Sequence, residues 1–597
     1  MSVRASGQIR QSQAITTWGP GALIDLPTQA GIVGGLECWP SVDKLQGIPE
    51  PRLERIVSEL TGVRNARLYA PPAHTGMPGQ TPSGIVVWRF PEWMLVQEET
   101  PSAKRRSRRL VHRRALDEKG RCEGRPVVAT RFVAACARGH VQDMRWRWFV
   151  HGAEDRCTRQ LWLHERGTGG DLADLEVRCE CGRSRRMSDA AEPGQLGRCW
   201  GARPWLGSEK SQEQCGEPLR LLIRTASNSY FPLVVTALSL PEQGGALAEK
   251  VTKLWEDLQI VEAPADLRMI KRKPQVAAAL TGHGEQEILE TIERLRHGDA
   301  QERPVKLAEL EVLLAAPEGY GEDVPIDPDF HARRLPEGAW RRPPLTDRLA
   351  AVVQIHRLRA VSALIGFTRF EAFTPDIYGD YETGSDVCPA MLAREPEWFP
   401  AFENRGEGLL LALEPEAIAG WLKRPAVQER LEQLAAGHKR WAQQRKARRE
   451  FPGGPYILLH TLSHLLMAQV AMHCGYPASD IRERICADYE QQRYALLLYT
   501  ASSDAEGTLG GLVSQGRHIA AHLEAALRSG GLCSNDPVCA QHSPDEGMEG
   551  RWLHGAACHG CALIAETSCE MRNNLLDRAL LVPTVAVDGA AFFDAPL

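Results

Sequence analysis

Residues 553–574 read LHGAACHGCALIAETSCEMRNN and place Cys558, Cys561 and Cys569 in one short segment near the end of a 597-residue chain. The C-x2-C spacing of the first two allows both sulfurs of one turn to reach the same zinc ion at about 2.3 Å. Three thiolates leave a tetrahedral site one ligand short. A fourth thiolate must come from another segment, and the identity of the fourth ligand decides how the C-terminal region folds.

Two further cysteines, Cys533 and Cys539, precede this segment. We predict that Cys539 completes a site with Cys558, Cys561 and Cys569, and that Cys533 is the spare. The alternative donors are His542, His554 and His559, and five reduced cysteines without a metal are the competing interpretation. Four protein ligands leave no position for water or substrate, so the ion would stabilise the fold and would not catalyse a reaction.

A second cysteine cluster lies in VRCECGRSRRM (177–187), GRCW (197–200) and QEQCGEPLR (212–220). It contains Cys179, Cys181, Cys199 and Cys215, which form two pairs at a separation typical of a zinc ribbon. We predict a second closed four-thiolate site here. A further set precedes it, consisting of Cys136, His140, His151 and Cys157. A third metal site and a core cysteine beside surface histidines explain this set equally well.

The composition is that of a soluble globular protein, with 43% hydrophobic and 25% charged residues and a net charge of −5. The N-terminus does not resemble a signal peptide. Sixteen cysteines in a cytosolic chain indicate metal sites or burial, because the cytosol keeps thiols reduced. The uncharged stretch 451–479 is long enough to span a membrane, but its histidines favour a buried helix. We therefore expect a cytoplasmic protein with no membrane span.

The pattern along the chain predicts a multidomain α+β fold. We expect a β- and loop-rich domain at 1–110, a cysteine-rich domain resembling a zinc ribbon at 111–240, a helical region and linker at 241–346, and an α/β region at 347–597 closed by the C-terminal zinc site. Within the last region, we predict helices at 347–363, 425–450, 456–474 and 512–531 and a strand at 493–500.

Because the net charge is negative, any contact with nucleic acid depends on local basic patches. One patch is the stretch 102–121 and the other is the end of the helix at 425–450. As phosphate contacts we predict Lys104, Arg105, Arg106, Arg108, Arg109, Arg445, Lys446, Arg448 and Arg449. Such contacts position a protein on DNA without reading its base sequence. A solvated linker and a solvated helix end are the competing interpretations.

No catalytic motif stands out. The chain lacks G-x-x-x-x-G-K-[ST], so it has no P-loop for ATP. The sequence HTLSH (460–464) lacks the glutamate of the metalloprotease motif H-E-x-x-H, and we interpret it as part of a core helix. We expect no enzymatic activity. The alternative is a metal-dependent nucleic-acid hydrolase, with candidate residues Glu403, Glu407, Asp504, Glu506 and His464.

Several stretches together resemble the DrmB family, core components of the DISARM anti-phage defence system. They include GPGALIDLP (19–27), FVAACARGHVQDMRW (132–146), LLHTLSHLL (458–466), YTASSDAEGTLGGL (499–512) and the C-terminal cysteine segment. Residues 456–580 are also similar to the MrfA-like zinc-binding domain found at the ends of superfamily 2 DNA helicases.

This resemblance implies a non-motor subunit that forms a DNA-binding core complex with a helicase-like protein, DrmA. ATP hydrolysis would then belong to DrmA, and a DNA methyltransferase would belong to the same system. The family's zinc motif would fall on Cys558, Cys561, Cys569 and one of Cys533 or Cys539. The implied cofactor is one or two structural Zn²⁺ ions.

Overall fold

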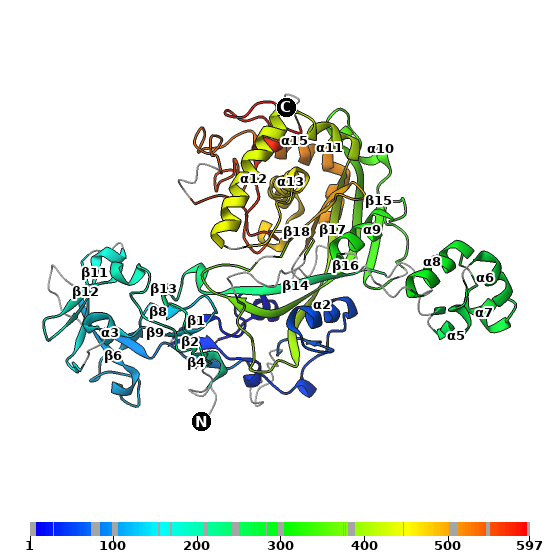
Figure 1. The fold of residues 1–597 in the computed structure, drawn as a ribbon. Coiled ribbons are helices and arrows are strands. Elements are labelled where there is room, and N and C mark those ends of the chain that lie inside the picture. Colours follow the sequence, from blue (N-terminus) through cyan, green and yellow to red (C-terminus); the bar gives the residue numbers. More distant parts are fainter. Residues whose placement is uncertain are drawn as a thin grey trace.

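The structure is a computed structural model. It describes residues 7–593 except 28, 73–83, 98–105, 153–155, 167–169, 208–212, 242–249, 252, 262, 282, 297–303, 326, 374, 377, 380–387, 446, 501–510 and 545–549. A seven-stranded sheet lies at its centre, with smaller sheets on the N-terminal side and helices on the C-terminal side (Figure 1).

The central sheet is antiparallel except for one short parallel pairing. Its main strands, in spatial order, are β14 (Phe231–Ser239), β16 (Leu349–Thr368), β17 (Trp398–Leu413), β19 (Arg493–Thr500) and β18 (Ile481–Asp488). In addition, β15 (Phe330–Arg334) pairs with β16, and β3 (Arg67–Tyr69) pairs in parallel with β17. Strands from both ends of the chain therefore meet in one sheet, and the expected boundaries at residues 240 and 346 fall between its members.

The helix predicted at 347–363 is wrong, because residues 349–368 form strand β16. Its sequence, LAAVVQIHRLRAVSALIGFT, is buried at most positions on both faces, because β14 and β15 pair along one edge and β17 along the other while layers cover the sheet. A strand buried on both faces has no alternation of polar and apolar residues. Its apolar run therefore looks like a buried helix when periodicity alone is considered.

Helix α13 (Gly454–Cys474) packs on β18 and β19, and α15 (Ile519–Gly530) packs on α13. Alone, α13 is long and apolar enough to cross a membrane, but 72% of its most apolar window is buried inside the protein. The predicted helices at 425–450 and 456–474 are confirmed as α12 (Pro425–Arg445) and α13, and the strand at 493–500 as β19. The helix expected at 512–531 consists of α14 (Gly511–Ser514), a 3-10 turn and α15.

Two small sheets carry the N-terminal cysteines. One has the order β12-β11-β10-β6-β5-β7 and the other the order β13-β8-β9. Their strands are β5 (Trp93–Val96), β6 (Arg106–His112), β7 (Val127–Ala129), β8 (Phe132–Ala135), β9 (Val141–Asp143), β10 (Leu161–Glu165), β11 (Leu175–Cys179), β12 (Ser184–Arg186) and β13 (Arg220–Ile223), beside α3 (Trp146–His151). The expected boundary at residue 110 falls inside β6. The six-stranded sheet therefore contains strands from both sides of this boundary.

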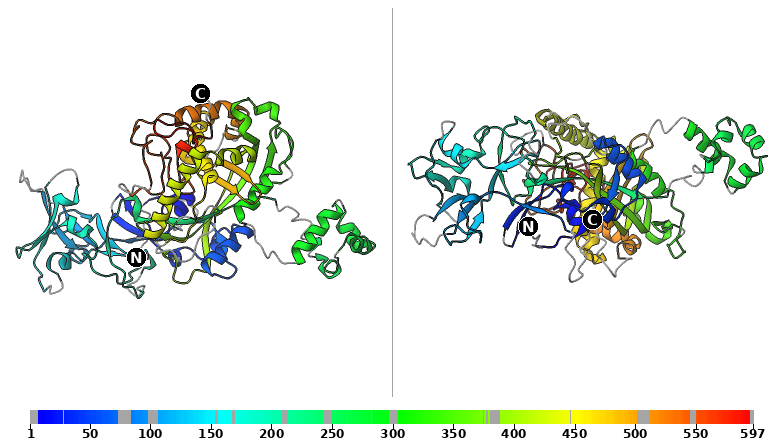
Figure 2. Two further views of the ribbon diagram at one scale, coloured as in Figure 1. Left: turned by 45° about the horizontal axis from the view of Figure 1, so that its top comes forward. Right: turned by 90° about the horizontal axis from the view of Figure 1, so that it is seen from below.

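A small helical cluster lies apart from these sheets (Figure 2). It contains α5 (Trp255–Leu258), α6 (Pro264–Ile270), α7 (Pro274–Ala279) and α8 (Glu285–Arg296), with a core of its own built from residues 251–292. Helix α9 (Val305–Leu314) returns to the central sheet and packs on β16 and β18. Other elements are α1 (Gln11–Thr16), β1 (Leu23–Leu26), β2 (Gln29–Val33), α2 (Pro51–Thr61), β4 (Val87–Arg89), α10 (Glu337–Trp340) and α11 (Pro415–Leu422).

Candidate metal centres and the adjacent groove

Four cysteine sulfurs converge in the C-terminal segment. Cys533 Sγ lies 3.4 Å from Cys558 Sγ, and Cys561 Sγ lies 3.8 Å from both Cys539 Sγ and Cys558 Sγ. These separations exceed the roughly 2.05 Å of a disulfide. They match the roughly 3.8 Å between neighbouring sulfurs of a tetrahedral zinc site with bonds of about 2.3 Å. The residues present therefore fit a closed zinc site with four cysteine ligands, which we call the C-terminal four-cysteine site.

Backbone amides in the same turns support this set of thiolates. The N–H of Gly560 donates to Cys558 Sγ at 3.3 Å, and the N–H of Asn535 donates to Cys533 Sγ at 3.4 Å. Outer hydrogen bonds of this kind orient metal ligands and favour their deprotonated form.

The fourth ligand differs from our prediction. Cys533, which we expected to be the spare, joins Cys539, Cys558 and Cys561, whereas Cys569 lies in a separate cluster with its sulfur 3.1 Å from Nε2 of His460. The reason is that the chain leaves the C-x2-C turn after Cys561 and brings Cys569 against α13. Spacing along the sequence does not determine which of two distant turns folds back onto a third.

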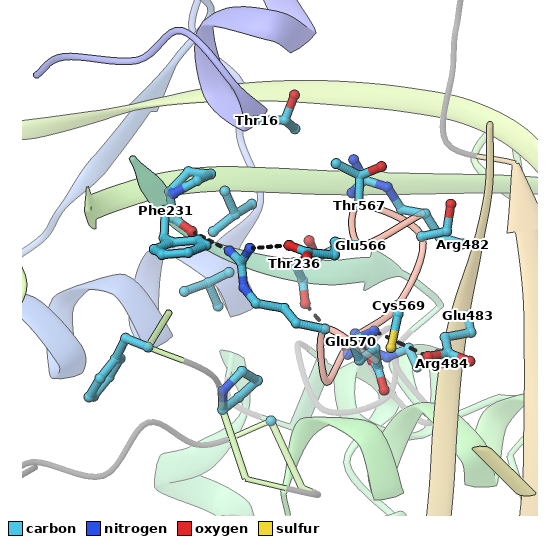
Figure 3. A pocket seen from close by; sticks show the side chains of 18 of the residues that line it. Thr16, Phe231, Thr236, Arg482, Glu483, Arg484, Glu566, Thr567, Cys569 and Glu570 are labelled. Atoms are coloured by element: carbon cyan, nitrogen blue, oxygen red, sulfur yellow. Dashed lines mark hydrogen bonds and ion pairs between the residues drawn. The ribbon is translucent and has the colours of Figure 1, made fainter. Parts of the chain in front are cut away.

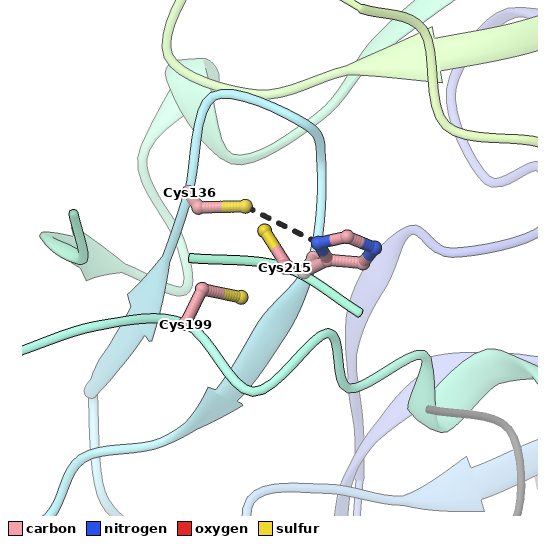
Figure 4. Close-up of side chains that lie close together, drawn as sticks. Cys136, Cys199 and Cys215 are labelled. Atoms are coloured by element: carbon pink, nitrogen blue, oxygen red, sulfur yellow. Dashed lines mark hydrogen bonds between the residues drawn. The ribbon is translucent and has the colours of Figure 1, made fainter. Parts of the chain in front are cut away.

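The N-terminal cysteines are also grouped differently from our prediction. Cys199 and Cys215 lie with Cys136 and His140, and Figure 4 shows the three cysteines pointing toward one another. Cys136 and His140 come from the turn between β8 and β9, and Cys136 Sγ lies 3.4 Å from Nδ1 of His140. The other imidazole nitrogen, Nε2, lies 2.8 Å from the Glu213 carboxylate. A carboxylate behind a histidine is typical of zinc sites, where it fixes the ring and its tautomer.

Gly201 brings two loops of this cluster together. Its φ of +73° lies in the left-handed region, and a Cβ there would meet the carbonyl oxygen of Glu213 at 1.7 Å. Its N–H donates to Cys199 Sγ at 3.2 Å. Only glycine permits this close approach, which places the carboxylate of Glu213 behind His140.

The second N-terminal cluster contains His151, Cys157, Cys179 and Cys181. Cys157 and Cys179 have their sulfurs 3.6 Å apart. His151 ends α3 and Cys179 ends β11, while Cys181 lies in the turn that leads to β12. The predicted ribbon of Cys179, Cys181, Cys199 and Cys215 is therefore split into two sites. Each pair is completed by a cysteine and a histidine from the set at 136–157 whose role the sequence left open.

The residues considered for hydrolysis have structural partners. Glu403 accepts a hydrogen bond from Arg359 at 2.9 Å. Glu407 is buried and accepts the backbone N–H groups of Leu512 and Val513 at 2.9 and 3.2 Å, where α14 begins. Asp504 and Glu506 lie outside the described residues. His464 lies in a buried cluster with His460, Glu483 and Cys569.

The predicted phosphate contacts fall into two settings. Arg108 and Arg109, on β6, form ion pairs with Glu165 and Glu123 at 2.8 and 3.1 Å. The backbone of Arg106 lies in the same strand, and Lys104, Arg105 and Lys446 are outside the described residues. Arg445 ends α12 and pairs with Glu371.

Arg445, Arg448 and Arg449 line a groove of about 850 Å³ between the end of α12 and the C-terminal metal-binding segment. The segment contributes Arg551 and Trp552 to its wall. The other aromatic lining residues are Phe373, Tyr378, Trp441, Phe451 and Tyr489, and the acidic ones are Glu371, Asp376 and Glu450. Figure 1 shows the orange and red loops of this segment beside α12. The sequence placed the basic helix end on the surface but gave no sign of the tryptophan-bearing loop opposite it.

Comparison with known families agrees with the metal site. Residues 462–562 match the family model described as the MrfA Zn-binding domain, a range that contains all four clustered cysteines from 533 to 561. The chain is therefore a protein with an MrfA-type zinc-binding domain at its C-terminal end. Residues 10–231 match a second model, DUF8724, described as a domain of unknown function.

A whole-chain relative gives the family. The DISARM protein DrmB of Bacillus paralicheniformis is 32% identical over 485 residues, which cover 78% of this chain and 82% of the relative. The chain belongs to the DrmB family of DISARM defence proteins. A crystal structure of the DUF1998 helicase MrfA bound to DNA aligns with 37% of this chain and 22% of that chain, at 12% identity and a TM-score of 0.16, too low to establish a shared arrangement.

Proposed function

We propose that this chain is a non-motor, DNA-binding and scaffolding subunit of the cytoplasmic DISARM system. Its partners would be a DrmA-type superfamily 2 helicase and other DISARM proteins such as a DNA methyltransferase. The observation that carries the proposal is the groove lined by arginines and aromatic rings where α12 meets the zinc-binding segment. Membership of the DrmB family supports the defence role.

The lining of the groove has the chemistry that holds a nucleic-acid strand. Arginines attract backbone phosphates, and tryptophan and tyrosine rings offer faces on which unpaired bases stack. Four arginines stand against three carboxylates, and Glu371 already pairs with Arg445. The electrostatic attraction is therefore modest, and stacking would supply much of the affinity. This balance favours single-stranded DNA over duplex DNA.

The metal centres support a scaffolding role. Closed sites with four protein ligands have no coordination position for substrate, so bound zinc would stabilise loops and not activate water. The C-terminal four-cysteine site holds the loops that precede and follow Trp552 and so shapes the groove. ATP hydrolysis would belong to the helicase partner, and this chain would supply part of the DNA path.

The proposal is tested with the full chain, alone and with its helicase partner, by fluorescence anisotropy on single-stranded, double-stranded and overhang DNA. Trp552→Ala is expected to weaken binding of single-stranded DNA by about tenfold, since stacking contributes about 1–3 kcal/mol per base. Arg448→Ala is expected to weaken it less and to reduce its salt dependence. Arg528→Ala, an exposed arginine on α15, is the matched control.

Two outcomes would contradict the proposal. One is DNA binding that is equal in the wild type and in the Trp552→Ala and Arg448→Ala variants. The other is failure of the chain to co-purify with a DrmA-type helicase. A nuclease assay with Mg²⁺ or Mn²⁺ tests the alternative of a hydrolase: cleavage that disappears in a folded Glu403→Gln variant would favour catalysis over scaffolding.

A further inference from the structure

A fourth cluster of metal-ligating side chains lies in the C-terminal core. His460 and His464 occupy successive turns on one face of α13, and their rings meet edge to face with centroids 4.6 Å apart. Nε2 of His460 lies 3.0 Å from Oε1 of Glu483 on β18 and 3.1 Å from Cys569 Sγ. Nε2 of His464 lies 3.4 Å from the same carboxylate oxygen. All four side chains are buried, and none is more than 6% exposed.

The outer nitrogens of both imidazoles are already committed. Nδ1 of His460 lies 3.2 Å from the carbonyl oxygen of Leu575, and Nδ1 of His464 lies 2.8 Å from that of Ala562. A carbonyl oxygen can only accept, so each Nδ1 carries the proton. In a neutral ring, each Nε2 then presents a lone pair toward the carboxylate of Glu483. Nε2 of His464 has no hydrogen-bond partner among the described residues.

Lone pairs that face a buried carboxylate repel it unless protons or a metal ion lie between them. Two imidazolium ions would place two positive charges in a dry site with their ring centroids 4.6 Å apart, which burial penalises strongly. A divalent ion instead balances one carboxylate and one thiolate and accepts both nitrogen lone pairs. The donor set of two imidazoles, one carboxylate and one thiolate suits Zn²⁺ and not Mg²⁺ or Ca²⁺.

Second contacts hold the other two donors in place. The Ser463 hydroxyl donates to Oε2 of Glu483 at 2.6 Å, while Oε1 faces the histidines and accepts the backbone N–H of Glu570 at 3.2 Å. The N–H of Asn573 donates to Cys569 Sγ at 3.1 Å, an interaction that favours the thiolate. Cys569 and Glu483 also line a cavity of about 420 Å³, and Figure 3 shows them close together at its wall. The cavity therefore reaches two of the four donors.

We infer that His460, His464, Glu483 and Cys569 form a fourth, structural metal centre that holds Zn²⁺ in the C-terminal core. Four protein ligands close the site to substrate. The ion would join α13, β18 and the loop that follows the C-terminal four-cysteine site, and so fasten the zinc-binding segment to the central sheet. The sequence HTLSH lacks the glutamate of H-E-x-x-H, but β18 supplies a carboxylate from a neighbouring strand.

The inference is tested by zinc quantification on the folded full-length chain. The wild type is expected to hold four zinc ions, one for each cluster of the described residues. Cys569→Ala and His464→Gln are each expected to lower the count by one. Cys486→Ala is the control, because Cys486 is a buried thiol on the same strand as Glu483 and lies outside the four clusters. An unchanged count in folded Cys569→Ala and His464→Gln variants would overturn the inference.

X-ray absorption at the zinc edge is measured on the wild type, so the result does not depend on whether a variant folds. Four filled sites predict sulfur at eleven of sixteen ligand positions, whereas the three cysteine-rich sites alone predict ten of twelve. The contrary result is a wild type with three zinc ions and sulfur at ten of twelve ligand positions. It would show that protons and not zinc occupy the cluster of His460, His464, Glu483 and Cys569. Cys569 would then donate to His460, and a protonated His464 would face Glu483. That result would also overturn the inference.

Discussion

The cysteine-rich candidate metal sites lie in two regions that differ in what else holds them together. The N-terminal clusters are set among two hydrogen-bonded sheets, and three of their ligands end or follow regular elements. The described residues of the C-terminal segment at 531–593 form turns and loops, with one isolated β-bridge between His554 and Leu576 and a single 3-10 helix at Arg578–Leu580. A metal ion would therefore add to an existing fold in the N-terminal region, whereas in the C-terminal segment it would organise loops that contain little regular structure.

The largest effect is expected from Cys561→Ser. Loss of the zinc ligand would free the turns that the four cysteines join, in a segment whose leucines and phenylalanines complete the α13 core. We expect a destabilisation of more than about 4 kcal/mol, because loss of a metal site is one of the few changes with effects this large. Binding to the proposed helicase partner should be lost as well. Thermal unfolding and co-purification measure the two effects. Cys474→Ser is the control, because Cys474 is a buried thiol outside the clusters. A Cys561→Ser variant that is stable without zinc at this site would contradict the view that metal organises the C-terminal segment.

A smaller and more local effect is expected from Cys179→Ser. The variant should lose one zinc ion, but the ladders from β10 to β6 and from β6 to β5 remain hydrogen bonded. We expect a loss of about 1–3 kcal/mol, confined to the turn at 179–184 and the end of α3. Hydrogen exchange followed by mass spectrometry localises it. Collapse of protection throughout the six-stranded sheet would show that the two regions do not differ in this way.

Acid should weaken the C-terminal half in particular. Burial, with the nearby Arg449, lowers the pKa of His438 to about 4 from an ordinary value near 6.5. The unfolded chain therefore binds a proton first as pH falls, and stability is lost between pH 6.5 and 4. At pH 5 this amounts to about 2 kcal/mol for one such histidine.

Chemical denaturation at pH 7 and pH 5 measures this loss. Zinc thiolates also protonate in acid. The test therefore compares the stability that the wild type loses between pH 7 and pH 5 with the stability that His438→Gln loses. The variant should lose less stability than the wild type on acidification. Equal losses would show that His438 does not contribute to the acid sensitivity of this half.

The smallest effect is expected from Arg108→Ala. Arg108 pairs with Glu165 in a partly exposed ion pair, which is worth about 1 kcal/mol or less. We expect less than a twofold change in DNA affinity, measured by anisotropy beside Arg448→Ala. If Arg108→Ala loses more affinity than Arg448→Ala, the DNA contacts β6 and not the C-terminal groove.

Sequence reasoning identified the elements that carry a strong local signal. The long helices α12 and α13 and the C-x2-C pair of Cys558 and Cys561 were predicted because their residue patterns are local. The strand β16 was predicted as a helix, since a strand buried on both faces lacks the period that distinguishes the two.

Ligand sets depend on contacts between distant segments, and here the sequence was less informative. Cys533 and Cys569 lie on opposite sides of the C-x2-C turn in sequence, and only the fold determines which of them reaches it. The partner of His460 and His464 is Glu483, which lies on the next strand along the chain. No motif defined by spacing within one helix would reveal that carboxylate.

Zinc removal followed by hydrogen exchange tests the central comparison most directly. The folded full-length chain is treated with a chelator, and exchange is followed across the described residues. We predict that protection in 553–582 is lost first and that the β5–β6–β10 ladder keeps most of its protection. Equal loss in both regions, or persistent protection of 553–582 in protein without zinc, would contradict the view that metal organises the C-terminal segment.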